Sequence, residues 1–435
     1  MTTNPAATPL DSDLARAYAA LTAKRAAHDR LWAYYDGDHP LVYSAARLES
    51  VFGHTRAPFI QNWCAIVIDA VLDRLNLRRF EVSDDPAATA RLNDLWTHTG
   101  LTLDDHEAHR AALVTGEAYV MAWTTAEGEV VAYHNDPRLC HLFDAADQPH
   151  RPDLGCKWWV GADGRRRLTL YRPDRFRYYV SRGPADAVSS ARAFVPADPP
   201  EAPNPTGRIP MFRLQRERRA LLGELTNVIP IQDAINKLVH DMMIAAEFGA
   251  FRQRWVISNA DVRTLKNAPN EIWSLPAGDG LGQPTQVGEF AGGDLGVYLD
   301  AIDRLAATVG ILTRTPRHYF RGQSGHPSGE ALIAMEAPLC KKVAHYIECF
   351  GAVWRQVGAY LLSLAGRPVN PAAIVPLYDA PETVQPRTRA EIRRLNAQAG
   401  LPLSTQLRRE GWDARQIAAL AHDRALAHGV NSTVH

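Results

Sequence analysis

Two stretches whose apolar residues would form a stripe along one side of a helix constrain this chain most strongly. The segment that joins them could not continue as a helix. In each stripe the apolar residues alternate at spacings of four and three, which places them on one side of a helix. The first stripe contains Ile231, Ile235, Leu238, Met242, Ala245 and Gly249, and the second contains Tyr298, Ile302, Leu305, Val309 and Leu312. We therefore predict two long helices that run as a hairpin.

The segment between the stripes, residues 253–293, is interrupted by prolines and glycines. Pro269, Pro276 and Pro284 would each break a helix, so we expect a small β-rich insert at the tip of the hairpin. A projection of this shape buries little surface by itself. We therefore expect the hairpin to pack against other copies of the chain.

Composition excludes several classes of protein. The chain has 435 residues, 46% of them hydrophobic, and equal numbers of basic and acidic side chains at 48 each. This balance argues against a protein that coats nucleic acid through overall charge. The five cysteines are widely spaced, which predicts a reducing compartment and no disulfide framework. Neither a signal peptide nor an apolar run of about 18 residues is apparent.

The fold class predicted from the remaining segments is α+β. Helices are expected over residues 11–28, 62–75 and 102–115, with hairpin strands between about 117 and 181. Residues 183–210 are expected to form a long exposed loop. A very long helix, kinked at Pro338, should run from about 328 to 364, followed by a proline-rich linker over 367–386 and three short helices.

One cluster of candidate metal ligands stands out, formed by Asp105, His106 and His109. His106 and His109 would share one face of a helix, but a zinc site needs further ligands from elsewhere in the chain. A solvated polar face is the favoured interpretation. The sequence also contains no phosphate-binding glycine loop and no nucleophile elbow, so enzymatic readings are disfavoured.

A basic segment follows the second stripe. Residues 313–328 contain no acidic side chain, and the candidate contacts to a polyanion are Arg314, Arg317, His318, Arg321 and His326. Glycine and proline make this segment irregular. It could bind a nucleic-acid backbone or serve only as a solvated connector, and composition favours neither.

Taken in order, several stretches resemble the portal proteins of tailed double-stranded-DNA bacteriophages, in particular the head-to-tail connectors of long-tailed phages. They are YYDGDHPL, NWCAIVIDAVLDRL, ALVTGEAYVMAW, IPIQDAINKLVHDMMIAAEFGAFRQRW, APNEIWSLP, GEFAGGDL, LTRTPRHYF, SGEALIAMEAPLCKKV and RLNAQAGLPLSTQLRREGW. The similarity covers roughly residues 30 to 425. One departure is IVPLYDAPE, where the family often has a tryptophan-centred strand.

The resemblance implies a portal fold with an α/β wing, a two-helix stem, a small β-rich clip, a long kinked spine helix and a short helical crown. The implied bounds are 1–222 for the wing, 223–252 and 294–312 for the stem helices, 253–293 for the clip, 313–327 for the tunnel loop, 328–386 for the long helix and wing return, and 387–435 for the crown and tail. The stripe residues within 231–242 and 298–309 would be the stem packing residues. Trp255, Ile272 and Trp273 would face partners from the clip.

The implied function is that of a non-enzymatic ring, typically a dodecamer, at one capsid vertex of the virion, assembled in the host cytoplasm. Its partners would be the terminase large subunit, a head–tail adaptor, the scaffold and major capsid proteins, and double-stranded DNA without sequence preference. No cofactor or metal is expected. The alternative is a metal-dependent nucleic-acid-processing enzyme that uses Asp105, His106 and His109 together with the basic segment.

Overall fold

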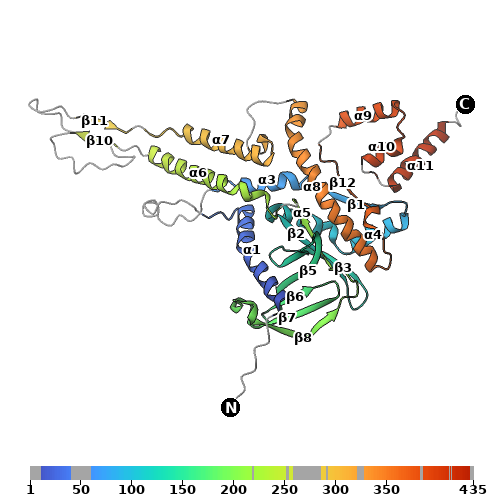
Figure 1. The fold of residues 1–435 in the computed structure, drawn as a ribbon. Helices are drawn as coiled ribbons and strands as arrows, with labels where there is room; N and C mark the ends of the chain where they lie inside the picture. Colours follow the sequence, from blue (N-terminus) through green and yellow to red (C-terminus); the bar gives the residue numbers. More distant parts are fainter. Residues whose placement is uncertain are drawn as a thin grey trace, which may run out of the picture.

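A computed structural model describes residues 11–40, 60–217, 220–250, 254–257, 286–290, 292–320, 328–382, 386–410, 412 and 414–431. Its main feature is a mixed α and β body from which two helices project side by side, with a pair of short strands toward the far end (Figure 1). The projecting helices are α6 (Ile229–Ala250) and α7 (Gly296–Thr313). The predicted hairpin is therefore confirmed.

The body is built from helices that alternate with short antiparallel sheets. Its helices are α1 (Ser12–Asp36), α3 (Trp63–Leu72), α4 (Pro86–His98), α5 (Leu101–Thr115) and α8 (Gly329–Leu364). A separate group of helices follows at the end of the chain, α9 (Pro386–Gln398), α10 (Leu403–Arg409) and α11 (Ala414–Asn431). The mixture confirms the predicted α+β class.

The described residues form four antiparallel sheets. The larger ones have the orders β3-β2-β9 and β4-β5-β6-β7-β8, and the smaller ones pair β1 with β12 and β10 with β11. The strands are β1 (Leu77–Val82), β2 (Glu117–Thr124), β3 (Val130–Asn135), β4 (Cys140–Ala145), β5 (Gln148–Val160), β6 (Arg165–Tyr171), β7 (Arg175–Pro184), β8 (Phe194–Pro203), β9 (Met211–Gln215), β10 (Arg254–Ile257), β11 (Gln286–Glu289) and β12 (Ile374–Tyr378).

Two predicted irregular segments contain strands. Residues 183–210, expected as a loop, include β8, which pairs with β7. The expected linker over 367–386 includes β12, whose Ile374 pairs with Val82 of β1. Prolines suggested loops in both places, but β8 and β12 each lie at the edge of a sheet, where a residue without an N–H is tolerated.

Helix starts follow the capping chemistry of the sequence. Asp11, Asn62, Asp85 and Ser328 each accept a hydrogen bond from a backbone N–H in the first turn of the helix that follows. These side chains satisfy N–H groups that have no partner inside the helix. The predicted starts of α1, α3 and α8 are thereby confirmed, although α1 continues to Asp36, beyond the expected end near residue 28.

Helix α8 provides the centre of the main core. Most of its apolar side is buried from Leu339 onward, and Trp354, in its C-terminal half, is fully buried. The Trp354 ring meets Trp96 of α4 edge-on at a centroid distance of 5.0 Å. The helix continues through Pro338, and the kink expected there stays a prediction. The first turns before Pro338 are more exposed, so α8 extends from the core toward the base of the hairpin (Figure 1).

Candidate functional site: the base and outer faces of the helical hairpin

The two stripes pack largely within their own subunit. Ile235, Ile302 and Val309 are buried in the main core, and Ile231, Leu238 and Leu305 are partly buried against it. Met242 and Tyr298, nearer the tip, are only half-buried. The apolar spacing therefore predicted a packed face correctly, but most of that face is covered by the same chain.

Other apolar side chains of the hairpin point to solvent. On α6 and α7 these are Met243, Val297, Leu299, Ile311 and Leu312. Ile257, Val287 and Phe290 near the tip are also more than half exposed. Exposed apolar side chains that gather on one projection are characteristic of a surface that binds another protein. Of the exposed residues on α6 and α7, Leu312 belongs to a predicted stripe and the others lie outside both stripes.

The pairing of the two strands at the tip depends on a glycine. Trp255 of β10 lies opposite Gly288 of β11. A Cβ at Gly288 would lie 2.4 Å from the Trp255 ring, so only glycine accommodates this ring position. Trp255 is half-buried, while Ile272 and Trp273 lie outside the described residues.

A buried ionic network joins the hairpin base to α8. The Lys342 ammonium donates to the backbone oxygen of Thr313, the last residue of α7, at 2.5 Å and approaches Glu224 Oε2 at 3.4 Å. Arg216 donates to the Tyr346 hydroxyl at 3.1 Å, and Tyr346 donates in turn to Glu224. Burial lowers the pKa of Lys342, although the Glu224 carboxylate opposes this effect. A cation at the C-terminus of α7 also complements the helix dipole.

A second network joins α6 to α1 and α3. Gln232 accepts from the Trp63 backbone N–H at 3.0 Å and donates to Asn236 at 2.9 Å. The His39 ring is stacked on Tyr34, contacts the Tyr34 backbone oxygen through Nε2 at 2.9 Å and contacts Asn236 through Nδ1 at 2.9 Å. His39 therefore has a structural role in the turn that follows α1.

Where the chain enters the hairpin, its backbone passes very close to the backbone of α5. A Cβ at Gly223 would lie 1.9 Å from the Val114 backbone oxygen of α5. Gly116, which ends α5 with φ +92°, would place a Cβ 2.6 Å from the Leu222 backbone nitrogen. Both positions therefore require glycine. At Gly223 the reason is the lack of space for a Cβ, and at Gly116 it is this lack of space together with the left-handed backbone conformation.

The basic segment after α7 is partly packed on the body. Arg314 caps α7 in a left-handed conformation, and Arg317 is exposed in a short 3₁₀ turn. His318 Nε2 lies 3.7 Å from Glu336 of α8, and the Phe320 ring contacts Trp63 at a centroid distance of 5.7 Å. Arg321 and His326 lie outside the described residues. The part of the predicted loop up to residue 320 is thus anchored.

The candidate metal cluster is not assembled for metal binding. His109 is fully buried, and its Nε2 accepts the Trp354 indole N–H at 2.9 Å. Burial and the neighbouring His106 lower the pKa of His109 to about 3, and burial raises the pKa of Asp105 to about 7. Within the described part of the chain, no group of three potential ligands could hold a metal ion. The packing explains His109 without any ion.

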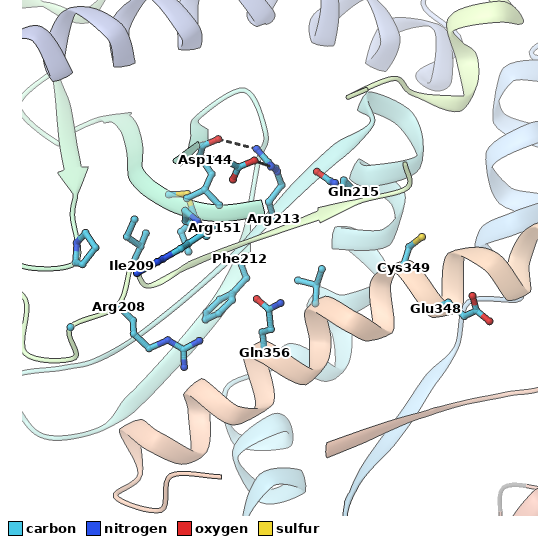
Figure 2. A pocket seen from close by; sticks show the side chains of 16 residues that line it. Asp144, Arg151, Arg208, Ile209, Phe212, Arg213, Gln215, Glu348, Cys349 and Gln356 are labelled. Atoms are coloured by element: carbon cyan, nitrogen blue, oxygen red, sulfur yellow. Dashed lines mark hydrogen bonds and ion pairs between the residues drawn. The ribbon is translucent and has the colours of Figure 1, made fainter. Parts of the chain in front are cut away.

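Two cavities in the body have mixed linings. One of about 620 Å³ lies between a sheet and α8, where Arg213 donates to Asp144 at 2.8 Å and Arg208 also lines the cavity (Figure 2). The other, about 840 Å³, has aromatic side chains on its walls, among them Trp123 and Trp159. Neither cavity brings together a nucleophile, a base and a group that would orient the base.

Comparisons with known proteins match a large part of the chain. The family model described as "Phage portal protein, SPP1 Gp6-like" matches residues 17–376. The chain belongs to this phage portal protein family. One relative is the portal protein of Mycobacterium phage D29, which is 21% identical over 337 residues, or 71% of this chain. The match spans 65% of that relative's length.

The sequence did not single out the residues that join the hairpin to the body. They are Lys342, Glu224 and Gln232. Lys342 could have been noticed, because it lies on the apolar side of α8 between Leu339 and Val343. Its partners come from two distant parts of the chain and could not have been read from spacing. Among the described residues, no helix is long and apolar enough to cross a membrane.

Proposed function

We propose that this chain is a subunit of a portal ring that sits at one vertex of a phage capsid, passes double-stranded DNA during packaging and ejection, and docks first the terminase and then the head–tail adaptor. The observation that carries the proposal is a family match over residues 17–376 combined with a projecting hairpin whose outer faces are apolar. Such a hairpin is suited to a ring, because identical subunits can cover each other's exposed faces.

The assignment of regions follows the same reasoning. In this proposal α6 and α7 are the stem, and β10 and β11 belong to the clip, whose Trp255, Ile272 and Trp273 face partners. Helices α9, α10 and α11 form the crown. The segment from Arg387 to Arg424 has eight arginines and four acidic residues, a net charge of 8 − 4 = +4, which suits contact with packaged DNA. The scaffold and major capsid proteins would contact the wing.

The chain as purified should form rings. Negative-stain microscopy with two-dimensional averaging is expected to show closed rings with a central channel, dodecameric within the particle. The physical reason is that the apolar side chains of the hairpin, such as Ile311 and Val297, have no cover in the subunit described here. A chain that sediments as a monomer over a wide range of concentrations would contradict the proposal.

The basic segment is expected to act on DNA rather than on assembly. Replacing Arg314, Arg317 and Arg321 with alanine should leave rings intact but reduce DNA packaging or retention by at least about tenfold, since each removes a cation that can contact phosphate. Packaged DNA per particle measures the effect. Arg304→Ala, at an exposed position on α7, is the matched control. Unchanged packaging in the triple variant would remove this segment from the DNA path.

The alternative of a metal-dependent nuclease loses its structural basis. Asp105 and His109 are both buried in the body, and His109 Nε2 accepts the Trp354 indole N–H. The favoured role is therefore the structural one.

A further inference from the structure

A groove on the body lies beside the base of the hairpin. Its volume is about 560 Å³, and its rim is formed by α1 and by the segment that leads into α6. The apolar residues of the rim are Ala23, Ala27, Leu31, Leu221, Leu222 and Ile229. Leu222 is 45% exposed although it is a leucine beside the core. Since an apolar cavity of about 150 Å³ can hold a benzene ring, this groove has room for several aliphatic side chains.

The wall supplied by α1 is suited to another helix. Ala23 and Ala27 are exposed and lie one turn apart, so their small side chains allow a second backbone to approach closely. The floor is polar. Lys24 donates to Glu117 at 2.6 Å, whereas His28 Nδ1 and His141 Nδ1 are buried without a hydrogen-bond partner among the described residues. An aliphatic side chain entering the groove would bury its surface against the apolar rim and leave the ion pair between Lys24 and Glu117 in place.

A ridge that matches the groove lies on α7. Ile302, Ala306 and Val309 face the core, and at about 100° per residue Ile311 lies on the opposite side of the helix. Ile311 is 78% exposed and the adjacent Leu312 is 54% exposed. Two neighbouring aliphatic side chains at this exposure form an apolar surface without cover.

The groove and the ridge lie on different flanks of the hairpin. Helix α6 contacts the end of α1 through the bond between Tyr34 and Asp233, and it packs against α7 elsewhere. In Figure 1, α6 runs between α1 and α7. A cyclic ring needs two different complementary patches on opposite flanks of each subunit, because every contact is heterologous. The groove and the ridge meet this requirement.

We propose that Ile311 and Leu312 of one subunit insert into the groove rimmed by Leu222 and Ala27 of the next subunit around the ring. The occupant is a second copy of this chain, because the groove is continuous with the hairpin through Ile229 and both patches are apolar. This inference rests on the proposed ring and specifies the contact that closes it.

Paired cysteines test the contact directly. In the Leu222→Cys, Ile311→Cys double variant, a short bismaleimide should yield a ladder of covalent oligomers up to the full ring on denaturing gels. Each single variant should stay monomeric on the gel, which also controls for Cys349, the one partly accessible natural cysteine among the described residues. The matched control pairs Leu222→Cys with Leu103→Cys, a highly exposed position on α5, and should give no ladder.

The outcomes separate this inference from the proposed function. Intact rings on micrographs without a ladder would overturn the contact and leave the ring standing. Wild-type protein that never forms rings would overturn both. A ladder of covalent oligomers that appears with the double variant and with neither single variant would support both the contact and the ring.

Opposite charges give an independent test. Leu222→Glu and Ile311→Lys, each alone, should raise the protein concentration needed for half-maximal ring assembly by more than about tenfold, because each would bury an unpaired charge. Combining them should restore assembly. Circular dichroism of each variant checks folding. Single variants that fold and assemble as the wild type does would overturn the contact.

Discussion

Replacing Lys342 with methionine is expected to lower the free energy of unfolding by about 3 kcal/mol. Lys342 is 8% exposed and its ammonium donates to the last carbonyl of α7, so removing the ammonium leaves that oxygen and part of the Glu224 charge without a partner. Methionine retains most of the side-chain volume, which limits the effect to the lost polar contacts. Urea unfolding at pH 7 measures the change.

The matched control for this variant is Lys341→Met. Lys341 is the adjacent residue on α8, it is exposed, and its substitution changes the net charge equally. Unfolding must be compared at one protein concentration, because ring assembly adds to apparent stability. Equal losses in the two variants would show that the network around Lys342 contributes no stability of its own.

Replacing Glu117 with leucine is expected to cost about 3–5 kcal/mol of unfolding free energy. Glu117 is 1% exposed; it accepts from Lys24 at 2.6 Å and from the Tyr119 hydroxyl. Burial alone would raise the pKa of Glu117, but Lys24 and Tyr119 outweigh burial and lower it. The ionised carboxylate therefore stabilises the folded state at pH values above 4.5, its pKa in the unfolded chain. This stabilisation is lost as the pH falls through the lower pKa that Glu117 has in the folded state.

A double-mutant cycle isolates this pair. Lys24→Met should also destabilise strongly, whereas the double variant should lose much less than the sum, because neither charge is then left unpaired. The exposed pair Arg25 and Asp29 on the same helix is the control, with a coupling energy below about 0.5 kcal/mol. An additive result for Lys24 and Glu117 would mean that the buried pair is not coupled.

The sequence predicted local structure well where the chemistry is local. Alternating spacing predicted α6, α7 and the buried side of α8, and Asp11, Asn62 and Ser328 marked helix starts because each cap bonds only to its own first turn. Strand β12 was missed, since its pairing with β1 joins residues about 300 positions apart and prolines suggested a linker.

The candidate site was predicted only in outline. The stripe of α6 indicated a packed face, but whether Ile235 meets its own chain or a neighbour depends on tertiary contacts that spacing does not contain. Ile311 did not belong to the α7 stripe and became notable only when the structure showed its exposure. The positions of Arg321, His326, Ile272 and Trp273 stay predictions, because they lie outside the described residues.

The way in which the hairpin is fixed has a mechanical consequence. Its base is held at three separate places, by Lys342 to α8, by Gln232 and Asn236 to α3 and the turn at His39, and by the Gly223 passage against α5. Because these attachments reach different elements of the body, no single contact can act alone as a hinge at the base. If the far end binds a partner, as proposed, a load applied there would pass along α6 and α7 into several elements of the core at once.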